Sequence, residues 1–221
     1  CFFVIKEKKH TFATNNLTDK KKQKIMKKLF LLLTLSLFTL SFVNAQEEKT
    51  QGKKDSEKEY VYSENIQDTF LGVKFGTSRE EVIKAFEKEG LYLDNRNSNR
   101  DFLVFLPSGR NIPFGGFNWD FVYAYFSNGK FYCIIFQYTP EYKETALSQF
   151  ESVLSALSSR YKMNEKPITD TNTYKCYTAK SKDRKVVAVD CKKEESSGGE
   201  MRYYVNLVYI DKTLDKSNDE L

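Results

Sequence analysis

The sequence predicts an α+β domain in which an antiparallel sheet carries two amphipathic helices on one face. Two segments space their apolar residues as helices do, and each is followed by three runs typical of strands. The turns between these runs are short, so neighbouring strands must be antiparallel. The predicted order is helix, three strands, helix, three strands (α-β-β-β-α-β-β-β), within a single domain over residues 60–211.

The first helix is predicted to begin near Ser78 and to end at Gly90. Thr77 or Ser78 can serve as its N-cap, and Glu80 or Glu81, three residues later, completes a capping box. Gly90 supplies the C-terminal stop. The apolar stripe consists of Val82, Ile83 and Phe86.

The second helix is predicted to open at Thr139-Pro140, because a cap residue followed by proline suits the first turn of a helix. Its apolar residues are alternately three and four positions apart, which is the spacing of one helix face. They are Leu147, Phe150, Leu154, Leu157 and Tyr161.

The strands are predicted at Phe102–Leu106, Phe117–Phe126, Lys130–Tyr138, Thr173–Lys180, Lys185–Cys191 and Met201–Ile210. Asn128-Gly129 is the strongest hairpin signal, because a tight turn of this kind needs positive φ at both positions. Lys182–Lys185 should turn the next hairpin, and Glu194–Gly199 forms a looser loop.

The N-terminal region reads as a leader. Met26 is followed by two lysines, a 15-residue apolar run from Leu29 to Val43, and a small-residue cleavage site at Ala45-Gln46. A transmembrane anchor is the alternative, but about 20 residues are needed to span a bilayer. We therefore expect residues 26–45 to be a signal peptide, and the protein to be secreted or periplasmic without stable membrane insertion.

The segments around the domain have separate interpretations. Residues 1–25 are predicted to be upstream sequence translated from a mis-chosen start, with a genuine extension as the alternative. Residues 46–59 contain no apolar side chain and should form a disordered tether, and residues 212–221 form a polar tail.

The charge balance does not favour nucleic acid or anionic lipid as a partner. The chain has 35 basic and 30 acidic side chains, a net charge of +5. The first 45 residues hold 9 of the basic and 2 of the acidic ones, which leaves 26 and 28, or about −2, for residues 46–221. The part that folds is therefore close to neutral.

Residue types also limit the chemistry. The only histidine is His10, so the domain can have neither a Ser-His-Asp or Cys-His nucleophile nor a histidine-ligated metal. Asn95, Asn97, Asn99 and Asp101 alternate as in a calcium loop, but Arg100 and Leu106 occupy the positions that require Gly and Glu. No metal and no cofactor is predicted. Asp120 and Asp190 are the acidic residues within predicted strands, and nothing in the sequence pairs them.

Three cysteines lie in the domain. In a secreted protein, two of Cys133, Cys176 and Cys191 should pair. If the hairpin turns at Asp183-Arg184, Cys176 lies opposite Cys191, which predicts a disulfide between them and a buried thiol at Cys133. The alternative is that all three are reduced, since a one-residue shift in register would turn the two sulfurs to opposite faces.

Aromatic residues are abundant, with 27 among residues 46–221. In the simplest register of the Asn128-Gly129 hairpin, one face collects Val122, Ala124, Phe126, Phe131, Cys133 and Ile135. The other face collects Trp119, Phe121, Tyr123, Tyr125, Tyr132, Ile134, Phe136 and Tyr138. This aromatic face is either core, covered by the helices or by residues 60–75, or a ligand-binding face formed by Trp119, Phe121, Tyr123, Tyr125, Tyr132 and Tyr138.

Two segments carry a family resemblance. F-L-G-V-K-F-G-T-S-R-E-E-V-I-K-A-F-E-K-E-G and the closing strand V-N-L-V-Y-I-D-K resemble small, uncharacterised secreted proteins of Bacteroidetes. Their tandem helix-plus-strands plan, over roughly residues 68–213, is similar to the β-lactamase-inhibitor-protein-like fold. The resemblance implies a sheet whose open face could bind a protein, and it carries no catalytic residue.

We therefore expect a secreted, non-catalytic binding protein that uses its sheet. The favoured partner is a protein, or a second copy through self-association. A glycan-binding module is the first alternative, because tyrosine and tryptophan also stack on sugar rings. A hydrolase with an unrecognised carboxylate pair is the second alternative.

Overall fold

The computed structural model of the protein describes residues 61–109, 111–196 and 198–215. The predicted upstream segment, signal peptide and tether, and the end of the polar tail, lie outside the described residues.

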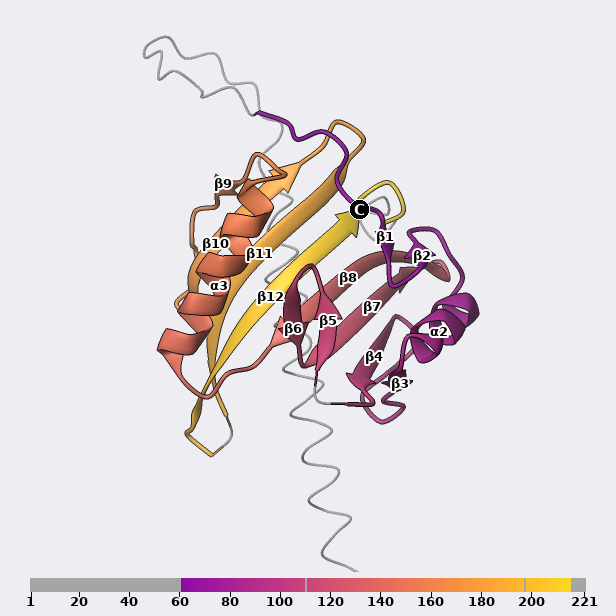
Figure 1. Ribbon diagram of the computed structural model, residues 1–221, viewed down its shortest axis with the longest axis horizontal. Coiled ribbons are helices and arrows are strands. Elements are labelled where there is room, and N and C mark those ends of the chain that lie inside the picture. The colour runs from indigo at the N-terminus through magenta and orange to yellow at the C-terminus, as the bar shows by residue number, and fades with distance from the viewer. Residues whose placement is uncertain (1–60, 110, 197, 216–221) are drawn as a thin grey trace, which may run out of the picture. The chain divides into compact units, whose positions relative to one another are not determined.

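The described chain is a mixed fold dominated by an eight-stranded antiparallel sheet (Figure 1). In spatial order its strands are β3 (Leu91–Leu93), β4 (Phe102–Pro107), β7 (Phe121–Ser127), β8 (Lys130–Tyr138), β12 (Met201–Asp211), β11 (Lys185–Glu195), β10 (Thr173–Lys180) and β9 (Asn164–Glu165). Two small hairpins pair β1 (Thr69–Phe70) with β2 (Val73–Lys74) and β5 (Ile112–Phe114) with β6 (Phe117–Trp119). The helices are α2 (Arg79–Lys88) and α3 (Lys143–Ser158).

The predicted order of elements is wrong in detail. The structure adds β1, β2, β3, β5 and β9, each two or three residues long and too short for a sequence period to be recognised. It also splits the predicted strand Phe117–Phe126 at Asp120, so that β6 pairs with β5 while β7 joins the large sheet.

Helix α2 begins as predicted. Ser78 is the N-cap, and its hydroxyl accepts a hydrogen bond from Glu81 N (3.4 Å), while Ser78 N donates to Glu81 Oε2 (3.2 Å). These reciprocal bonds satisfy donors that a helix otherwise leaves unpaired at its first turn. Val82 and Phe86 are the buried residues of the helix.

Helix α3 begins later than predicted, at Lys143 with Tyr142 as N-cap. Thr139 does not cap it: its backbone N and its Oγ1 both donate to Asp120 Oδ2, at 2.7 and 2.8 Å, and the helix begins four residues later. This link between segments 19 residues apart overrides the local cap signal.

Both helices and both small hairpins pack on one side of the sheet, called the first face below (Figure 1). Phe86 of α2 meets Phe105 of β4 with ring centroids 4.9 Å apart. Phe114 of β5 stacks on Phe136 of β8 at 4.0 Å, and Trp119 of β6 lies 6.0 Å from the same Phe136 ring. The first face is therefore an aromatic core with its own covering layer.

A β-bulge in the β7–β8 hairpin decides which side chains reach each face. Asn128 and Gly129 turn the chain with φ of 50° and 74°, as the sequence predicts, and Phe126 pairs with Phe131. Beyond this point Tyr125 pairs with Cys133, which leaves Tyr132 as the extra residue. An added residue reverses the alternation of the rest of β8 relative to β7.

Candidate functional site

The opposite side of the sheet, the second face, is organised in three rows that run across the strands from β10 to β4. Strand register defines them. The first row is Lys180, Val186, Ile210, Cys133, Tyr125 and Phe102. The second is Thr178, Ala188, Val208, Ile135, Tyr123 and Val104. The third is Cys176, Asp190, Asn206, Gln137 and Phe121.

The first two rows are mainly apolar and their central side chains are buried. Val208 is 2% exposed, Ile135 3% and Val104 4%. The helices and small hairpins of the described residues all contribute to the core on the first face, so they do not supply this burial. The two rows therefore form a second apolar layer of the sheet, on the side opposite the described helices and hairpins.

The third row is a continuous chain of hydrogen bonds that begins at a residue of the second row. The Tyr123 hydroxyl donates to Gln137 Oε1 (3.1 Å), and Gln137 Nε2 donates to Asn206 Oδ1 (2.9 Å). Asn206 Nδ2 then donates to Asp190 Oδ1 (2.8 Å). Lys192 Nζ, 3.4 Å from Asp190 Oδ2, closes the row with an ion pair.

These contacts decide what the row can do chemically. Burial raises the pKa of the Tyr123 phenol well above its ordinary value, with Tyr204 and Asp94 adding to the effect, so the hydroxyl stays protonated and donates. The Asp190 carboxylate is held by an amide and an ammonium group. The row satisfies its polar groups internally, which allows an apolar partner to cover it without leaving them unpaired.

The predicted aromatic binding face is wrong in composition. Trp119 is 0% exposed in the first-face core, where its Nε1 donates to the Phe114 carbonyl at 3.1 Å. The bulge places Ile134 and Phe136 on the first face as well, and Tyr138 packs against the same core. Phe121, Tyr123 and Tyr125 do share the second face, and Tyr132 is the partly exposed residue of the bulge.

The predicted disulfide is also wrong. The β10–β11 connection is a three-residue loop, Lys182–Arg184, with Arg184 at φ 65°, and not a two-residue turn at Asp183-Arg184. Cys176 therefore lies opposite Asp190 on the second face, while Cys191 points into the first-face core. Cys133, Cys176 and Cys191 are all free thiols.

The thiols are poor nucleophiles. Burial raises the pKa of Cys176 to about 11, with Asp190 adding to the rise and Lys166 and Lys192 opposing it. Burial and Asp190 likewise raise the pKa of Cys191 to about 11, and burial raises that of Cys133 well above its ordinary value. A thiol is reactive only as its thiolate, so little of any of the three is reactive near neutral pH.

Sequence reasoning named Asp190 but missed Gln137 and Asn206. Each is a polar residue inside an otherwise apolar strand, between Phe136 and Tyr138 or between Val205 and Leu207. A buried polar residue in such a strand needs a partner, and the register supplies one only when all strands are aligned. The sequence therefore shows that Gln137 and Asn206 each need a polar partner, but it does not show that they lie side by side in one row.

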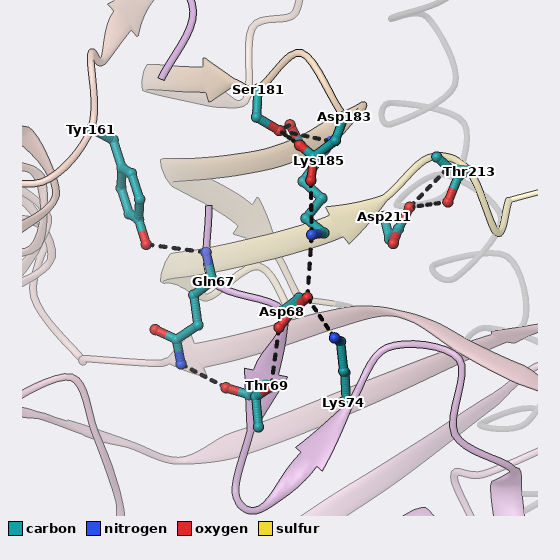
Figure 2. A network of polar contacts seen from close by, with 10 residues as sticks. All are labelled: Gln67, Asp68, Thr69, Lys74, Tyr161, Ser181, Asp183, Lys185, Asp211 and Thr213. Carbon is teal, nitrogen blue, oxygen red and sulfur yellow. Dashed lines mark hydrogen bonds and ion pairs between the residues drawn. The ribbon is translucent and has the colours of Figure 1, made fainter. Parts of the chain in front are cut away.

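A second polar cluster holds the N-terminal segment of the domain against the β10–β11 hairpin (Figure 2). The Asp68 carboxylate lies 3.2 Å from Lys185 Nζ and 3.5 Å from Lys74 Nζ. Nearby, Gln67 N donates to the Tyr161 hydroxyl at 3.4 Å. Partial burial raises the pKa of Asp68, but the hydrogen bonds from Lys185 and Thr69 and the charges of Lys185 and Lys74 together lower it by more, so the net pKa is below its ordinary value. These fastening contacts hold the N-terminal segment of the domain to the β10–β11 hairpin and to Tyr161.

The calcium-like stretch is also a local turn. Asp94 Oδ1 accepts from Arg96 N (3.0 Å), and Asp94 Oδ2 accepts from Asn97 Nδ2 (2.6 Å). Asn99 Oδ1 accepts from the backbone N of Asp101 and of Phe102. Within residues 61–215 as described, no group of three or more His, Cys, Asp or Glu side chains could hold a metal ion.

In the part of the chain that the structure describes, neither helix is long and apolar enough to cross a bilayer. No protein-family model, curated protein or solved structure matches this chain.

Proposed function

We propose that this chain is a secreted, non-catalytic binding protein that holds a protein partner on the second face of its sheet. One observation carries the proposal: two apolar rows run side by side across six strands, on a face to which the described helices and hairpins contribute nothing. Apolar surface of this extent is rarely left open to water in a soluble protein. The leader sequence supports export, and the resemblance to secreted Bacteroidetes proteins with an open sheet points the same way.

The polar groups of the domain support binding over catalysis. A general acid or base must be able to exchange a proton with a substrate. Asp190 is engaged by Asn206 and Lys192, and Asp120 by Thr139. The three thiols are largely protonated and therefore unreactive. What remains on the second face is apolar surface beside a hydrogen-bonded polar row, which is the composition of a protein interface.

Site-specific photo-cross-linking in the producing cell tests the proposal. A p-benzoylphenylalanine replacing Tyr123 places the reactive group on the second face, where the native ring is partly exposed. The matched control replaces Tyr142, which is 67% exposed at the start of α3. We expect a discrete covalent adduct with a polypeptide from position 123 and none from position 142. Position 142 is the more accessible, so non-specific collisions would favour it, and adducts from 142 alone would contradict the proposal.

A further inference from the structure

We propose that the first face carries a separate binding site for a saccharide with an acidic group, either a carboxylate or a sulfate ester. The site, called the tyrosine–lysine site, consists of Tyr174 of β10, Lys193 of β11, Tyr203 of β12 and Lys143 of α3. It lies at the end of the sheet where α3 begins (Figure 1). It goes beyond the proposed function, because its two tyrosines pack against the first-face core and not on the second face.

A β-bulge places Tyr174 in the site. The register of β10 with β11 shifts between Thr173 and Lys175, so Tyr174 is the extra residue of β10. In a regular strand it would share the second face with Cys176, whereas the bulge lets it pack on the first face beside Tyr203. The two ring centroids are 6.5 Å apart and the ring planes differ by 23°. The bulge therefore produces a pair of nearly parallel tyrosine rings.

The ring pair has the properties of a sugar-binding platform. Tyr174 and Tyr203 are both half-buried, so part of each side chain is open to solvent. The face of an aromatic ring carries partial negative charge, which attracts the C–H groups on the apolar side of a sugar ring. Each phenol oxygen can also exchange hydrogen bonds with sugar hydroxyls. One sugar ring can therefore lie on the pair.

Two ammonium groups share one of these rings. Lys143 Nζ lies 4.6 Å from the centroid of the Tyr174 ring, and Lys193 Nζ lies 5.6 Å from the same centroid. Among the residues that the structure describes, neither lysine forms an ion pair with a carboxylate. Like charges that share one ring repel each other. An anion between them relieves the repulsion and accepts a charge-assisted hydrogen bond from each.

A neighbouring lysine shows what this pair lacks. Lys175 Nζ lies 5.9 Å from the centroid of the Phe150 ring, and it also forms an ion pair with Glu151. The chain thus supplies a carboxylate for that lysine, and in its described part supplies none for Lys143 or Lys193. The ligand therefore brings the carboxylate, or a sulfate in its place.

The surroundings limit the charge of the ligand. Glu144 follows Lys143 in the first turn of α3, and Glu195 lies two positions beyond Lys193 on the same side of β11. A polyanion such as single-stranded nucleic acid would meet these carboxylates as well as the two lysines. The slightly negative net charge of residues 46–221 also opposes a polyanion. A saccharide with a single acidic group avoids this repulsion.

Isothermal titration calorimetry of the exported protein tests the site with xylotetraose carrying one glucuronate, unsubstituted xylotetraose and a single-stranded oligothymidylate. We expect the glucuronate-bearing probe to bind at least about tenfold more tightly than the neutral one, because only the former accepts the charge-assisted hydrogen bonds. A galacto-oligosaccharide with one sulfate ester shows whether carboxylate or sulfate is preferred. Three results would each overturn the proposal: no binding of either acidic saccharide, equal binding of acidic and neutral saccharides, or tighter binding of the oligonucleotide.

Removing charge from the two lysines locates the site. Lys143→Gln combined with Lys193→Gln should weaken binding of the acidic saccharide by about tenfold or more, to the level of the neutral one. Both side chains are partly exposed, so thermal unfolding should be nearly unchanged. Lys84→Gln combined with Lys88→Gln removes the same charge from exposed positions of α2, and this matched control should bind as the wild type does. Full acidic-saccharide binding by the Lys143/Lys193 variant would place the ligand elsewhere and overturn the proposal.

The platform has its own variant. Tyr203→Leu keeps an apolar side chain but removes the ring, so it should weaken the acidic and the neutral saccharide alike. Unchanged affinity in a folded Tyr203→Leu protein would contradict the role of the rings. The photo-adduct from position 123 should persist in all of these variants, because position 123 lies on the opposite face. The saccharide site and the protein-binding face can therefore fail separately.

Discussion

The two faces of the eight-stranded sheet use alternate residues of the same strands, yet they are buried in different ways. On the first face, Phe136 is enclosed by Phe114 and Trp119, which the chain itself supplies from the β5–β6 hairpin. On the second face, the neighbouring Ile135 is equally buried, but the described helices and hairpins do not cover it. The layer of described helices and hairpins therefore distinguishes the first face from the second.

The largest expected effect comes from truncating adjacent residues of β8. Phe136→Ala should cost about 3–5 kcal/mol of unfolding free energy at any protein concentration, because it opens a cavity in the chain's own core. Ile135→Ala should cost less, about 2 kcal/mol, because it removes fewer atoms and the described helices and hairpins add no layer on its side of the sheet. Urea unfolding of both variants is the measurement. Equal losses would mean that the two faces stabilise the fold alike.

A middle-sized effect should follow from interrupting the polar row. Asn206→Ala leaves Gln137 and Asp190 each without one partner, at a cost of about 1–3 kcal/mol for the unsatisfied groups. Asn118→Ala, on the exposed side of β6, is the control and should be nearly neutral. Urea unfolding of both variants is the measurement. If the two variants unfold alike, the row does not stabilise the second face.

The helix layer offers a change that should leave the second face intact. Ser78→Ala removes the N-cap of α2 and should cost about 1 kcal/mol. The photo-adduct from position 123 should be unchanged, because α2 packs on the first face. Thermal unfolding and cross-linking of the same variant check the two statements together. A lost adduct in a folded Ser78→Ala protein would mean that the faces are coupled.

The smallest expected effect concerns the fastening contacts in Figure 2. Asp68→Asn should cost about 0.5–1 kcal/mol at neutral pH, in the range of partly exposed ion pairs. The pKa of Asp68 is below its ordinary value of 3.8 in the folded protein, so its contribution is complete above that pH and is lost as the pH falls through the folded pKa. Urea unfolding of wild type and Asp68→Asn at neutral and at strongly acidic pH should show the difference shrink. A difference that persists in acid would have another origin.

Local signals in the sequence were sufficient for several elements. The bounds of β8 and β10, the Asn128-Gly129 turn and the Ser78–Glu81 capping box follow from residues that are close together in the chain. Apart from the strands too short to show a period, the errors arose where a distant or single-residue effect decided the outcome. Asp120 occupies Thr139 and delays α3, while the bulge at Tyr132 exchanges the faces of Ile134 and Ile135.

The candidate site depended on the same kind of effect. The hydrogen-bonded chain from Tyr123 to Asp190 joins residues of four strands, and a shift of one position in any register would break it. Sequence reasoning therefore placed Phe121, Tyr123 and Tyr125 together but also included Trp119 and Tyr138, which belong to the core. The residue pattern predicts the longer strands, whereas the register between strands is known only from the assembled sheet.

The separation of Cys176 and Cys191 by the sheet has a consequence for how the protein matures. Because one sulfur lies on each side of the backbone layer, no oxidant can join them without breaking the β10–β11 pairing. The described domain can therefore fold without a disulfide between these two residues, in a reducing or in an oxidising compartment. Export would change the surroundings of the two thiols without joining them.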